Sequence, residues 1–356
     1  MPLHITLVRR GYSPTGGAES YLKRFGNALN KAGHHASLLC TDDWPDAEWP
    51  YGELIRLKAS TPIRFANAVR RHRDPGSFLF SLERIWECDC YRAGDGLHRA
   101  WLTRRAEFEP ALKKHLRLLN PKHSRILELE EYLFREKGAR HVITNSRLVK
   151  NEIVSEFAYP EEKISVVYNG LSVTSPAVNP NARDEARRRL GLNRSTVLFA
   201  GSGWERKGLQ YAIEAVRGLD TVQLIVAGKG KKPSNTPANV RFLGPISDMS
   251  RLYCAADMLV LPTIYDPFSN ACLEALSFGL PVITTNANGF SEIITPGLHG
   301  EIIDRPNNIQ ALQAAIASWS DQEKRASSAT PCRALASEYT IDRNVQETVQ
   351  ILKEVE

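Results

Sequence analysis

The chain has 356 residues, more than one hydrophobic core usually supports, which predicts two domains. Hydrophobic residues make up 42% and charged residues 24% of the chain. This is ordinary for a soluble globular protein, and no apolar run approaches the ~20 residues of a membrane-spanning helix. Residues 1–14 lack the basic and apolar regions of a signal peptide. We therefore expect a cytoplasmic protein.

The excess of positive charge lies in the first half of the chain. Residues 1–170 hold 27 Lys and Arg against 21 Asp and Glu, whereas residues 171–356 hold 19 of each. Within residues 56–125, 16 basic residues face 7 acidic ones. Such a segment favours a polyanionic partner, such as an anionic membrane surface, a phosphorylated glycolipid or a nucleic acid. The alternative is a solvated basic face.

The six cysteines are scattered through the chain, which is typical of reduced thiols rather than of a disulfide framework. Cys88 and Cys90 have one residue between them, not the two to four of a zinc site, and no second pair accompanies them. We expect no metal site.

Strands and helices alternate through the first half. A strand over 4–8, a glycine-containing loop, a helix that ends at Gly33 and a strand over 36–40 form a βαβ unit, which implies a parallel sheet with a right-handed crossover. Further strands are predicted over 77–82, 139–146 and 163–171, with one or two long helices over 105–137 and a helix over 147–157.

The pattern restarts after a linker at 171–194 that contains a short helix near 183–190. The predicted strands have the sequences STVLFAGS, VQLIVAGKG, VRFLGPI, DMLVLPT, LPVITT and GEII, and the predicted helices cover 207–217, 247–255, 268–278 and 290–294. We predict an α/β fold with two Rossmann-like domains facing across a cleft, where ligands bind beyond the carboxyl ends of the strands. The domains are 1–170 and 171–337, and residues 338–356 form a helix that packs back toward the first domain.

Two loops that follow strands carry groups suited to an anion. Gly16 and Gly17 lie between a strand and a helix, where backbone N–H groups can meet a negative charge, although half of such loops are simple tight turns. Arg206 and Lys207 stand at the start of another helix and can clamp a phosphate or diphosphate.

Two acids flank the start of the helix predicted over 268–278. Asp266 precedes it and Glu274 falls in its second turn, with Ser269 or Asn270 as the N-cap. Glu274 can accept hydrogen bonds from vicinal hydroxyls such as those of a ribose, and Asp266 would face other hydroxyls. The structural alternative is that Glu274 pairs with an Arg and Asp266 caps the turn.

These motifs resemble those of a known enzyme family. The stretch from Asp266 to Glu274, followed by Gly279-Leu-Pro-Val and Gly289-Phe-Ser-Glu, is similar to the E-x(7)-E region of retaining GT-B glycosyltransferases of family 4. The earlier glycine loops occur in that family's order, so the resemblance covers nearly the whole chain. Residues 91–102 (YRAGDGLHRAWL) make it most similar to lipopolysaccharide core glucosyltransferases.

The resemblance implies a division of roles. Arg206 and Lys207 would neutralise the diphosphate, and Glu274 would bind the ribose. Asp266, with the backbone of Phe268, Ser269 and Asn270, would hold the transferred sugar. Asp266 departs from the family pattern, which usually has Glu there, and this leaves the donor sugar open. Cations and a helix N-terminus can stabilise a diphosphate leaving group without a metal or another cofactor.

Asp95 and His98 are the candidate catalytic residues of the first domain, beside the acceptor and the reactive carbon. A structural hydrogen bond is the alternative role for this pair. The expected donor is a UDP-sugar, and the expected acceptor is a glycolipid or lipopolysaccharide core at the inner face of the cell membrane. Two other functions stay open: a nucleotide-sugar epimerase of the same fold, and a non-catalytic protein that binds anionic lipid. Nucleic acid is not expected, because no recognition helix or stacking platform is present.

Overall fold

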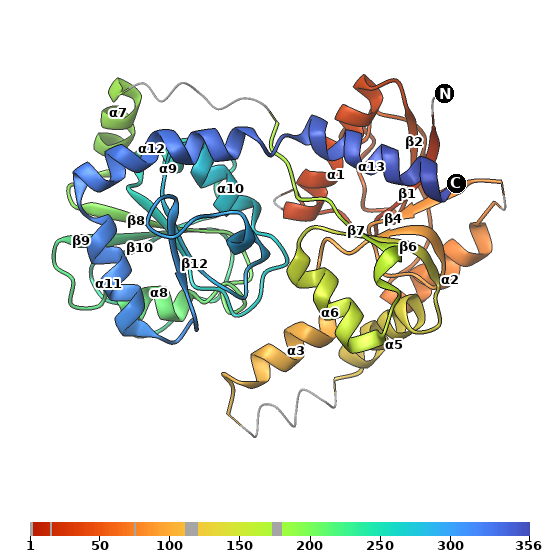
Figure 1. The fold of residues 1–356 in the computed structure, drawn as a ribbon, viewed down its shortest axis with the longest axis horizontal. Coiled ribbons are helices and arrows are strands. Elements are labelled where there is room, and N and C mark those ends of the chain that lie inside the picture. The colour runs from red at the N-terminus through yellow and green to blue at the C-terminus, as the bar shows by residue number, and fades with distance from the viewer. Residues whose placement is uncertain (1–2, 15, 75, 111–119, 173–179) are drawn as a thin grey trace. The chain divides into compact units, whose positions relative to one another are not determined.

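The computed structural model describes residues 3–14, 16–74, 76–110, 120–172 and 180–356. The helices predicted over 105–137 and the linker predicted over 171–194 each include residues outside these ranges. The chain divides into two compact units (Figure 1). One is formed by residues 1–172 together with 341–356, and the other by residues 173–340.

The first unit is built on a seven-stranded sheet whose strands are all parallel. The strand order is β3-β2-β1-β4-β5-β6-β7, so the direction of winding reverses between β1 and β4. At such a point the loops that follow neighbouring strands diverge and leave room for a ligand. The strands are β1 (His4–Val8), β2 (His35–Cys40), β3 (Leu54–Arg56), β4 (Phe78–Ser81), β5 (Cys88–Arg92), β6 (Ala139–Thr144) and β7 (Ile164–Val166).

Helices cover both faces of this sheet. Helix α1 packs against α13 on one face, whereas α5 contacts α2, α3 and α6 on the other. The helices are α1 (Gly17–Lys31), α2 (Pro62–His72), α3 (His98–Ala106), α5 (Pro121–Phe134), α6 (Arg147–Phe157) and α13 (Ile341–Val355), with the 3-10 turns η1 (Asp46–Glu48) and η2 (Glu161–Lys163).

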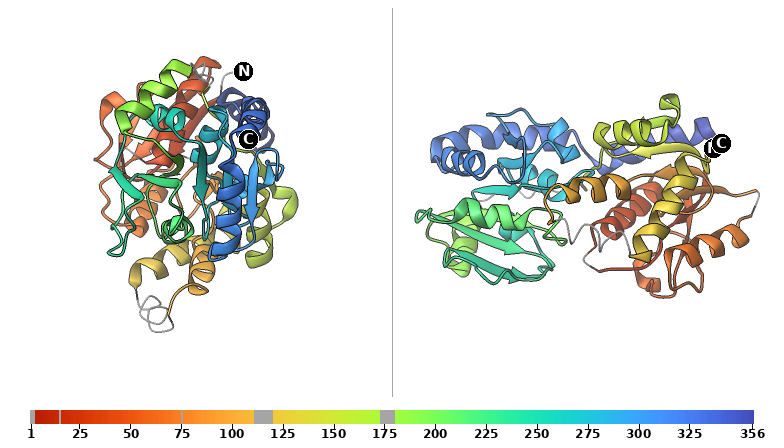
Figure 2. Two further views of the ribbon diagram at one scale, coloured as in Figure 1. Left: turned by 90° about the vertical axis from the view of Figure 1, so that its left-hand side faces the viewer. Right: turned by 90° about the horizontal axis from the view of Figure 1, so that it is seen from below.

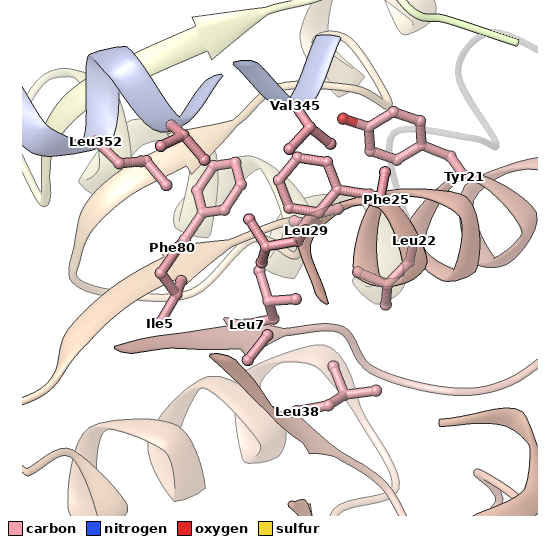
Figure 3. Close-up of a cluster of buried hydrophobic side chains, with 14 of the residues drawn as sticks. Ile5, Leu7, Tyr21, Leu22, Phe25, Leu29, Leu38, Phe80, Val345 and Leu352 are labelled. Carbon is pink, nitrogen blue, oxygen red and sulfur yellow. The ribbon is translucent and has the colours of Figure 1, made fainter. Parts of the chain in front are cut away.

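The C-terminal helix α13 belongs to the core of the first unit. Figure 3 shows Val345 and Leu352 packed with Phe25 of α1 and Phe80 of β4, and all four side chains are buried. A polar link accompanies this packing: the Tyr21 hydroxyl donates to Oδ1 of Asn344 over 2.8 Å. The apolar face of α13 is thus covered by the unit that begins the chain.

The second unit has a six-stranded parallel sheet in the order β10-β9-β8-β11-β12-β13. The winding again reverses at the centre, here between β8 and β11. The strands are β8 (Ser195–Ala200), β9 (Val222–Ala227), β10 (Val240–Gly244), β11 (Met258–Leu261), β12 (Val282–Thr285) and β13 (Gly300–Ile303).

Two groups of helices enclose this second sheet (Figures 1 and 2). Helix α8 contacts α11 on one face, and α7, α9, α10 and α12 pack in pairs on the other. Their bounds are α7 (Pro180–Leu190), α8 (Leu209–Val216), α9 (Ser250–Ala255), α10 (Asn270–Ser277), α11 (Ile309–Trp319) and α12 (Gln322–Ser337), and η3 (Gly289–Glu292) is a 3-10 turn. None of the helices in the described residues is long and apolar enough to cross a membrane.

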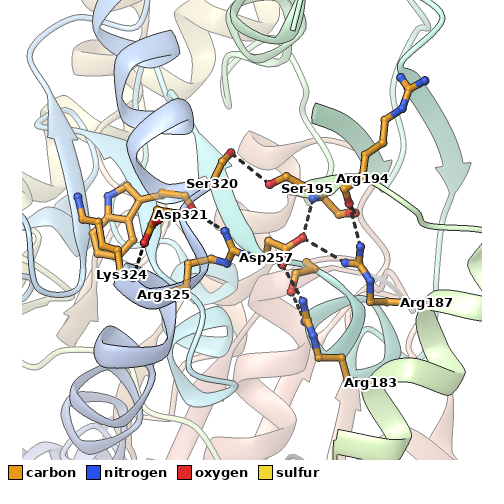
Figure 4. Close-up of polar contacts among 12 residues, drawn as sticks. Arg183, Arg187, Arg194, Ser195, Asp257, Ser320, Asp321, Lys324 and Arg325 are labelled. Atoms are coloured by element: carbon orange, nitrogen blue, oxygen red, sulfur yellow. Dashed lines mark hydrogen bonds and ion pairs between the residues drawn. The ribbon is translucent and has the colours of Figure 1, made fainter. Parts of the chain in front are cut away.

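A buried carboxylate ties α7 and α12 to the second sheet (Figure 4). Asp257 lies just before β11 and is 4% exposed. Its carboxylate forms ion pairs with Arg183 at 2.7 Å, Arg187 at 3.1 Å and Arg325 at 3.3 Å. The backbone N–H of Thr196 donates to the same carboxylate over 2.7 Å. Several cations and a backbone donor together offset the desolvation of this one anion.

The alternation of strands and helices follows the sequence prediction in both units, but some elements were missed. Strand β5 has the sequence CDCYR, which contains two charged residues, yet every residue in it is buried. Asp89 is compensated by Arg73 at 3.0 Å, and Arg92 by the side chain of Asn169 at 2.7 Å. Hydrophobic periodicity in the sequence does not reveal such pairing. Strand β3 and helices α2, α3, α11 and α12 were also not predicted. The helix predicted over 290–294 is the 3-10 turn η3.

We predict that Asp257→Asn destabilises the second unit by ~3 kcal/mol, because three arginines lose the anion that compensates them. Amide hydrogen exchange in β8 and β11 measures this local free energy. Asp248→Asn is the matched control, since Asp248 pairs with Arg251 at the surface and its loss should change the free energy by less than ~1 kcal/mol. Equal effects of the two changes would contradict the role of Asp257.

Candidate functional site

The loops after three adjacent strands of the second unit meet at the carboxyl edge of its sheet. Arg206 and Lys207 follow β8, Asp266 follows β11 and Asn288 follows β12. Because β8 pairs with β11 and β11 with β12, these loops are neighbours at the point where the winding reverses. Side chains separated by up to about eighty positions in the sequence thus come together.

Lys207 and Asp266 form a buried ion pair at the start of α10. The Lys207 ammonium lies 3.0 Å from Oδ2 of Asp266 and 3.4 Å from Oγ of Ser269. Lys207 is 8% and Asp266 4% exposed. Arg206 extends the cluster, with its guanidinium 3.9 Å from the same carboxylate and its own side chain about one third exposed. The cations predicted to meet a diphosphate therefore contact the acid predicted to hold the sugar.

The charges of this cluster set the protonation of Asp266. Burial raises the pKa of its carboxyl group, but Lys207 and Arg206, together with hydrogen bonds, lower it more, so the pKa lies below the ordinary 3.8. Asp266 is therefore ionised at neutral pH despite its burial. The ion pair in turn holds the Lys207 ammonium beside the first turn of α10.

Asn288 organises the same corner and was not singled out from the sequence. Its Oδ1 accepts from the backbone N–H groups of Ser269 and Phe290, and its Nδ2 donates to Oγ1 of Thr284 over 3.0 Å. The backbone of Asp266 pairs with this segment through Ala287 and Gly289. The sequence signal for Asn288 was an Asn-Gly pair three residues after a predicted strand.

Ser269 occupies the N-cap position of α10, and its hydroxyl makes no capping hydrogen bond. Asn270 is the first residue of the helix, and the ring of Phe268 packs edge-on against Phe290 at 5.8 Å. Glu274 is half-buried in the second turn, where its Oε2 accepts from the Tyr253 hydroxyl over 2.8 Å. An aromatic hydroxyl thus fixes the position of Glu274.

A close approach of backbone explains one glycine of the Arg206-Lys207 loop. Gly208 has φ +75°, and a Cβ there would lie 1.9 Å from the carbonyl oxygen of Pro262. Only glycine lets the loop after β8 come this near to the end of β11. That contact brings Lys207 within reach of Asp266.

In the first unit, Gly16 is the N-cap residue of α1 and Gly17 begins the helix. A Cβ on Gly16 would lie 1.7 Å from Oε2 of Glu19. Glu19 in turn accepts from Arg9, whose guanidinium also lies 2.9 Å from Oδ2 of Asp95. The glycine therefore makes room for a carboxylate, and Arg9 connects this loop to the candidate residue Asp95.

His98 is the first residue of α3, and its Nε2 lies 2.9 Å from Nδ1 of His123 on α5. Its backbone N–H and that of Arg99 donate to Glu130, a fully buried carboxylate that also binds Arg84 at 2.9 Å. Glu130 was missed from the sequence. The sequence feature that could have identified Glu130 is its place on the same helix face as the buried Leu129 and Leu133.

The described residues contain neither a metal site nor a reactive thiol. No group of three or more His, Cys, Asp or Glu side chains there is placed to hold a metal ion. All six cysteines are free thiols and five of them are buried. Burial raises the pKa of Cys272, in the first turn of α10, to about 12, so it stays protonated at neutral pH.

Comparisons with known proteins agree with this geometry. Residues 15–175 match the family described as Glycosyltransferase Family 4, and residues 194–322 match Glycosyl transferases group 1. The two matches fall largely in different units, and the two Rossmann-like domains have the architecture called GT-B. Both halves and the fold therefore class the chain with the GT-B glycosyltransferases.

Within this class the chain resembles lipopolysaccharide core glucosyltransferases. It is 23% identical over 334 residues to the lipopolysaccharide glucosyltransferase WaaG of Escherichia coli, covering 86% of each chain. The crystal structure of WaaG superposes with a TM-score of 0.81 at 21% identity over 98% of this chain and 99% of that one. An uncharacterised glycosyltransferase of Methanocaldococcus jannaschii, MJ1607, is 28% identical over 251 residues, 65% of this chain and just under two thirds (64%) of that one.

A second similar structure contains a nucleotide sugar. Alr3699/HepE of Anabaena, solved in complex with UDP-glucose, has a TM-score of 0.76 at 18% identity and covers 99% of this chain and all of that one. At this identity the likeness concerns the fold.

We predict that Lys207→Met lowers the free energy of unfolding of the second unit by ~3 kcal/mol at pH 7, because Asp266 stays buried without its nearest cation. The wild-type pKa of Asp266 is lowered, so the pair contributes stability above the ordinary pKa of 3.8 and loses it as the pH falls below that value. The difference between variant and wild type should therefore shrink in acid. Hydrogen exchange or urea denaturation on both sides of pH 3.8 measures it, and a difference independent of pH would be the contrary result.

Proposed function

We propose that this protein is a retaining glycosyltransferase that moves a hexose from a UDP-sugar to a glycolipid or lipopolysaccharide core acceptor. The observation that carries the proposal is the buried Lys207–Asp266 pair at the start of α10, with Arg206 beside it. The family matches in both halves of the chain support the reaction class.

The cluster suits the departure of a nucleoside diphosphate. As the glycosidic bond breaks, negative charge grows on the phosphate oxygens, and prepositioned cations stabilise that charge without reorganising. Arg206 offers a planar fork and Lys207 a point charge, while the N-terminus of α10 adds a favourable dipole. These groups supply the stabilisation in the proposed mechanism, which uses no metal ion.

The binding roles follow from the same arrangement. Glu274, oriented by the Tyr253 hydroxyl, would accept from the ribose hydroxyls of the donor. Asp266 and the backbone of residues 268–270 would hold the transferred hexose. The ion pair of Asp266 also keeps Lys207 in place. Support for a UDP-sugar comes from the similar fold of HepE, which was solved in complex with UDP-glucose.

The proposed reaction retains the configuration of the hexose. The acceptor hydroxyl would attack on the face from which the diphosphate leaves, and a departing phosphate oxygen would take its proton. Asp95, ion-paired with Arg9, and His98, paired with His123, are the proposed catalytic residues together with Asp266. His98 would position the hexose rather than attack it.

A peripheral site at an anionic membrane fits a glycolipid acceptor. Much of the basic excess between residues 56 and 125 is compensated locally, for example Arg70 by Glu87 and Arg73 by Asp89. Arg64 and Arg71 on α2 are exposed and can meet lipid phosphates. The proposal therefore places the membrane contact at α2.

We predict that UDP or one UDP-sugar selectively raises the melting temperature, since a ligand at 100 times its Kd adds about 2.7 kcal/mol of stability. Arg206→Gln should weaken binding of the nucleotide at least about tenfold, because it removes a charge-assisted hydrogen bond to the diphosphate. Arg251→Gln, an exposed change on α9, is the control. Full transferase activity in folded Glu274→Ala or Lys207→Ala variants would refute the site.

We also predict binding to liposomes that contain anionic lipid, none to neutral liposomes, and release at high salt, because exposed charges are screened. Arg64→Gln with Arg71→Gln should weaken binding by about 1 kcal/mol per charge. Arg241→Gln with Arg251→Gln removes as much charge from the second unit and serves as the control. Vesicle co-sedimentation measures all of these, and binding that ignores lipid charge would exclude the membrane contact.

A further inference from the structure

The carboxylate of Asp266 contacts the same cations that the proposed function assigns to the diphosphate. Its Oδ2 lies 3.0 Å from the Lys207 ammonium and 3.9 Å from the Arg206 guanidinium. Its pKa lies below the ordinary value because these cations outweigh the effect of burial, so the carboxylate is charged at neutral pH. Asp266 and a bound diphosphate would therefore be two anions that share one pair of cations.

The surrounding structure fixes this carboxylate. The backbone N–H of Asp266 donates to the carbonyl oxygen of Ala287 over 3.0 Å, and its carbonyl oxygen accepts from the N–H of Gly289 over 2.9 Å. The residue is 4% exposed. Lys207, 8% exposed, also lies within 3.4 Å of Oγ of Ser269. Moving the carboxylate away from a diphosphate would break these contacts.

A diphosphate bound to Lys207 would lie close to Asp266. A charge-assisted hydrogen bond from an ammonium to a phosphate oxygen is about 2.8 Å long. Because Oδ2 of Asp266 lies 3.0 Å from the same nitrogen, the carboxylate and phosphate oxygens would be at most about 6 Å apart. Anions repel each other at this separation, and burial removes much of the water and salt that would screen them.

We propose that Asp266 lowers the affinity of the protein for the free nucleoside diphosphate and thereby favours its release after sugar transfer. In the intact donor, hydroxyl groups of the hexose donate to the carboxylate and offset its repulsion of the diphosphate. After transfer those donors have left with the hexose, and the repulsion is no longer offset.

The charge of the product adds to this difference. Once the released diphosphate has lost the acceptor's proton to solvent, its terminal phosphate carries a second ionisation, with a pKa of about 6 for a phosphate monoester. At neutral pH the product is thus more negative than the donor. Asp266 therefore disfavours the product more than the donor, at a site whose cations attract both.

Asp266→Asn measures the sign of this effect. Asparagine has nearly the same shape and its Oδ1 can still accept from Lys207, but it carries no charge. UDP should therefore bind at least about tenfold more tightly to the variant. UDP-glucose should gain less, because it loses charge-assisted hydrogen bonds from the hexose. Isothermal titration calorimetry on the full chain at neutral pH measures both affinities. Unchanged or weaker binding of UDP would show that Asp266 serves mainly to hold Lys207, and would overturn the proposal.

Three further variants separate the local charge from other effects. Asp266→Ser is a second neutral variant, in which water can solvate the Lys207 ammonium, and it should also tighten UDP. Asp266→Glu keeps the charge and should leave the UDP affinity within about threefold of wild type. Asp248→Asn removes an exposed carboxylate of the second unit and should change neither affinity. Equal tightening in Asp248→Asn would assign the effect to overall charge and refute the role of Asp266.

The role of Asp266 rests on the proposed function, and the same titrations distinguish their failures. A wild-type chain that binds neither UDP nor UDP-glucose refutes the proposed donor site itself. A wild-type chain that binds UDP, with no tighter binding in either neutral variant, refutes only the role of Asp266 in product release.

Discussion

The carboxylate of Asp266 is held ionised inside the second unit by the ammonium of Lys207, and the arrangement of the donor-site candidates depends on that contact. An isolated buried carboxylate would be costly, so the loop after β8 must deliver a cation to the loop after β11. Gly208 permits the close approach that this requires. Ser269, at the head of α10, completes the same cluster.

The same physical requirement recurs elsewhere in the molecule. Asp257 forms ion pairs with three arginines and thereby ties α7 and α12 to the second sheet. In the first unit, Glu130 pairs with Arg84 and accepts hydrogen bonds from the first N–H groups of α3. In each case a buried anion fixes the position of a helix. The helices that present candidate residues, α3 with His98 and α10 with Glu274, are therefore set by polar contacts as well as by apolar packing.

The two units differ in the chemistry that their sheet edges present. In the second, the described cluster at the carboxyl edge combines one buried acid with two cations, which favours an anionic ligand such as a diphosphate. In the first, a cavity at the carboxyl edge is lined by four acidic and four basic side chains.

The sequence by itself determined the α/β class, the two Rossmann-like domains and most of the strands, because buried parallel strands are short apolar runs bounded by glycine and polar loops. It also identified the motifs around Arg206, Asp266 and Glu274, which lie at strand ends, although their catalytic and binding roles stay predictions. Only the tertiary structure decided which charges meet. Lys207 and Asp266 are far apart in the chain, and Glu130 and Asn288 have roles set by partners on other elements. Ion pairing and burial depend on distances in space, which periodicity along one chain does not encode.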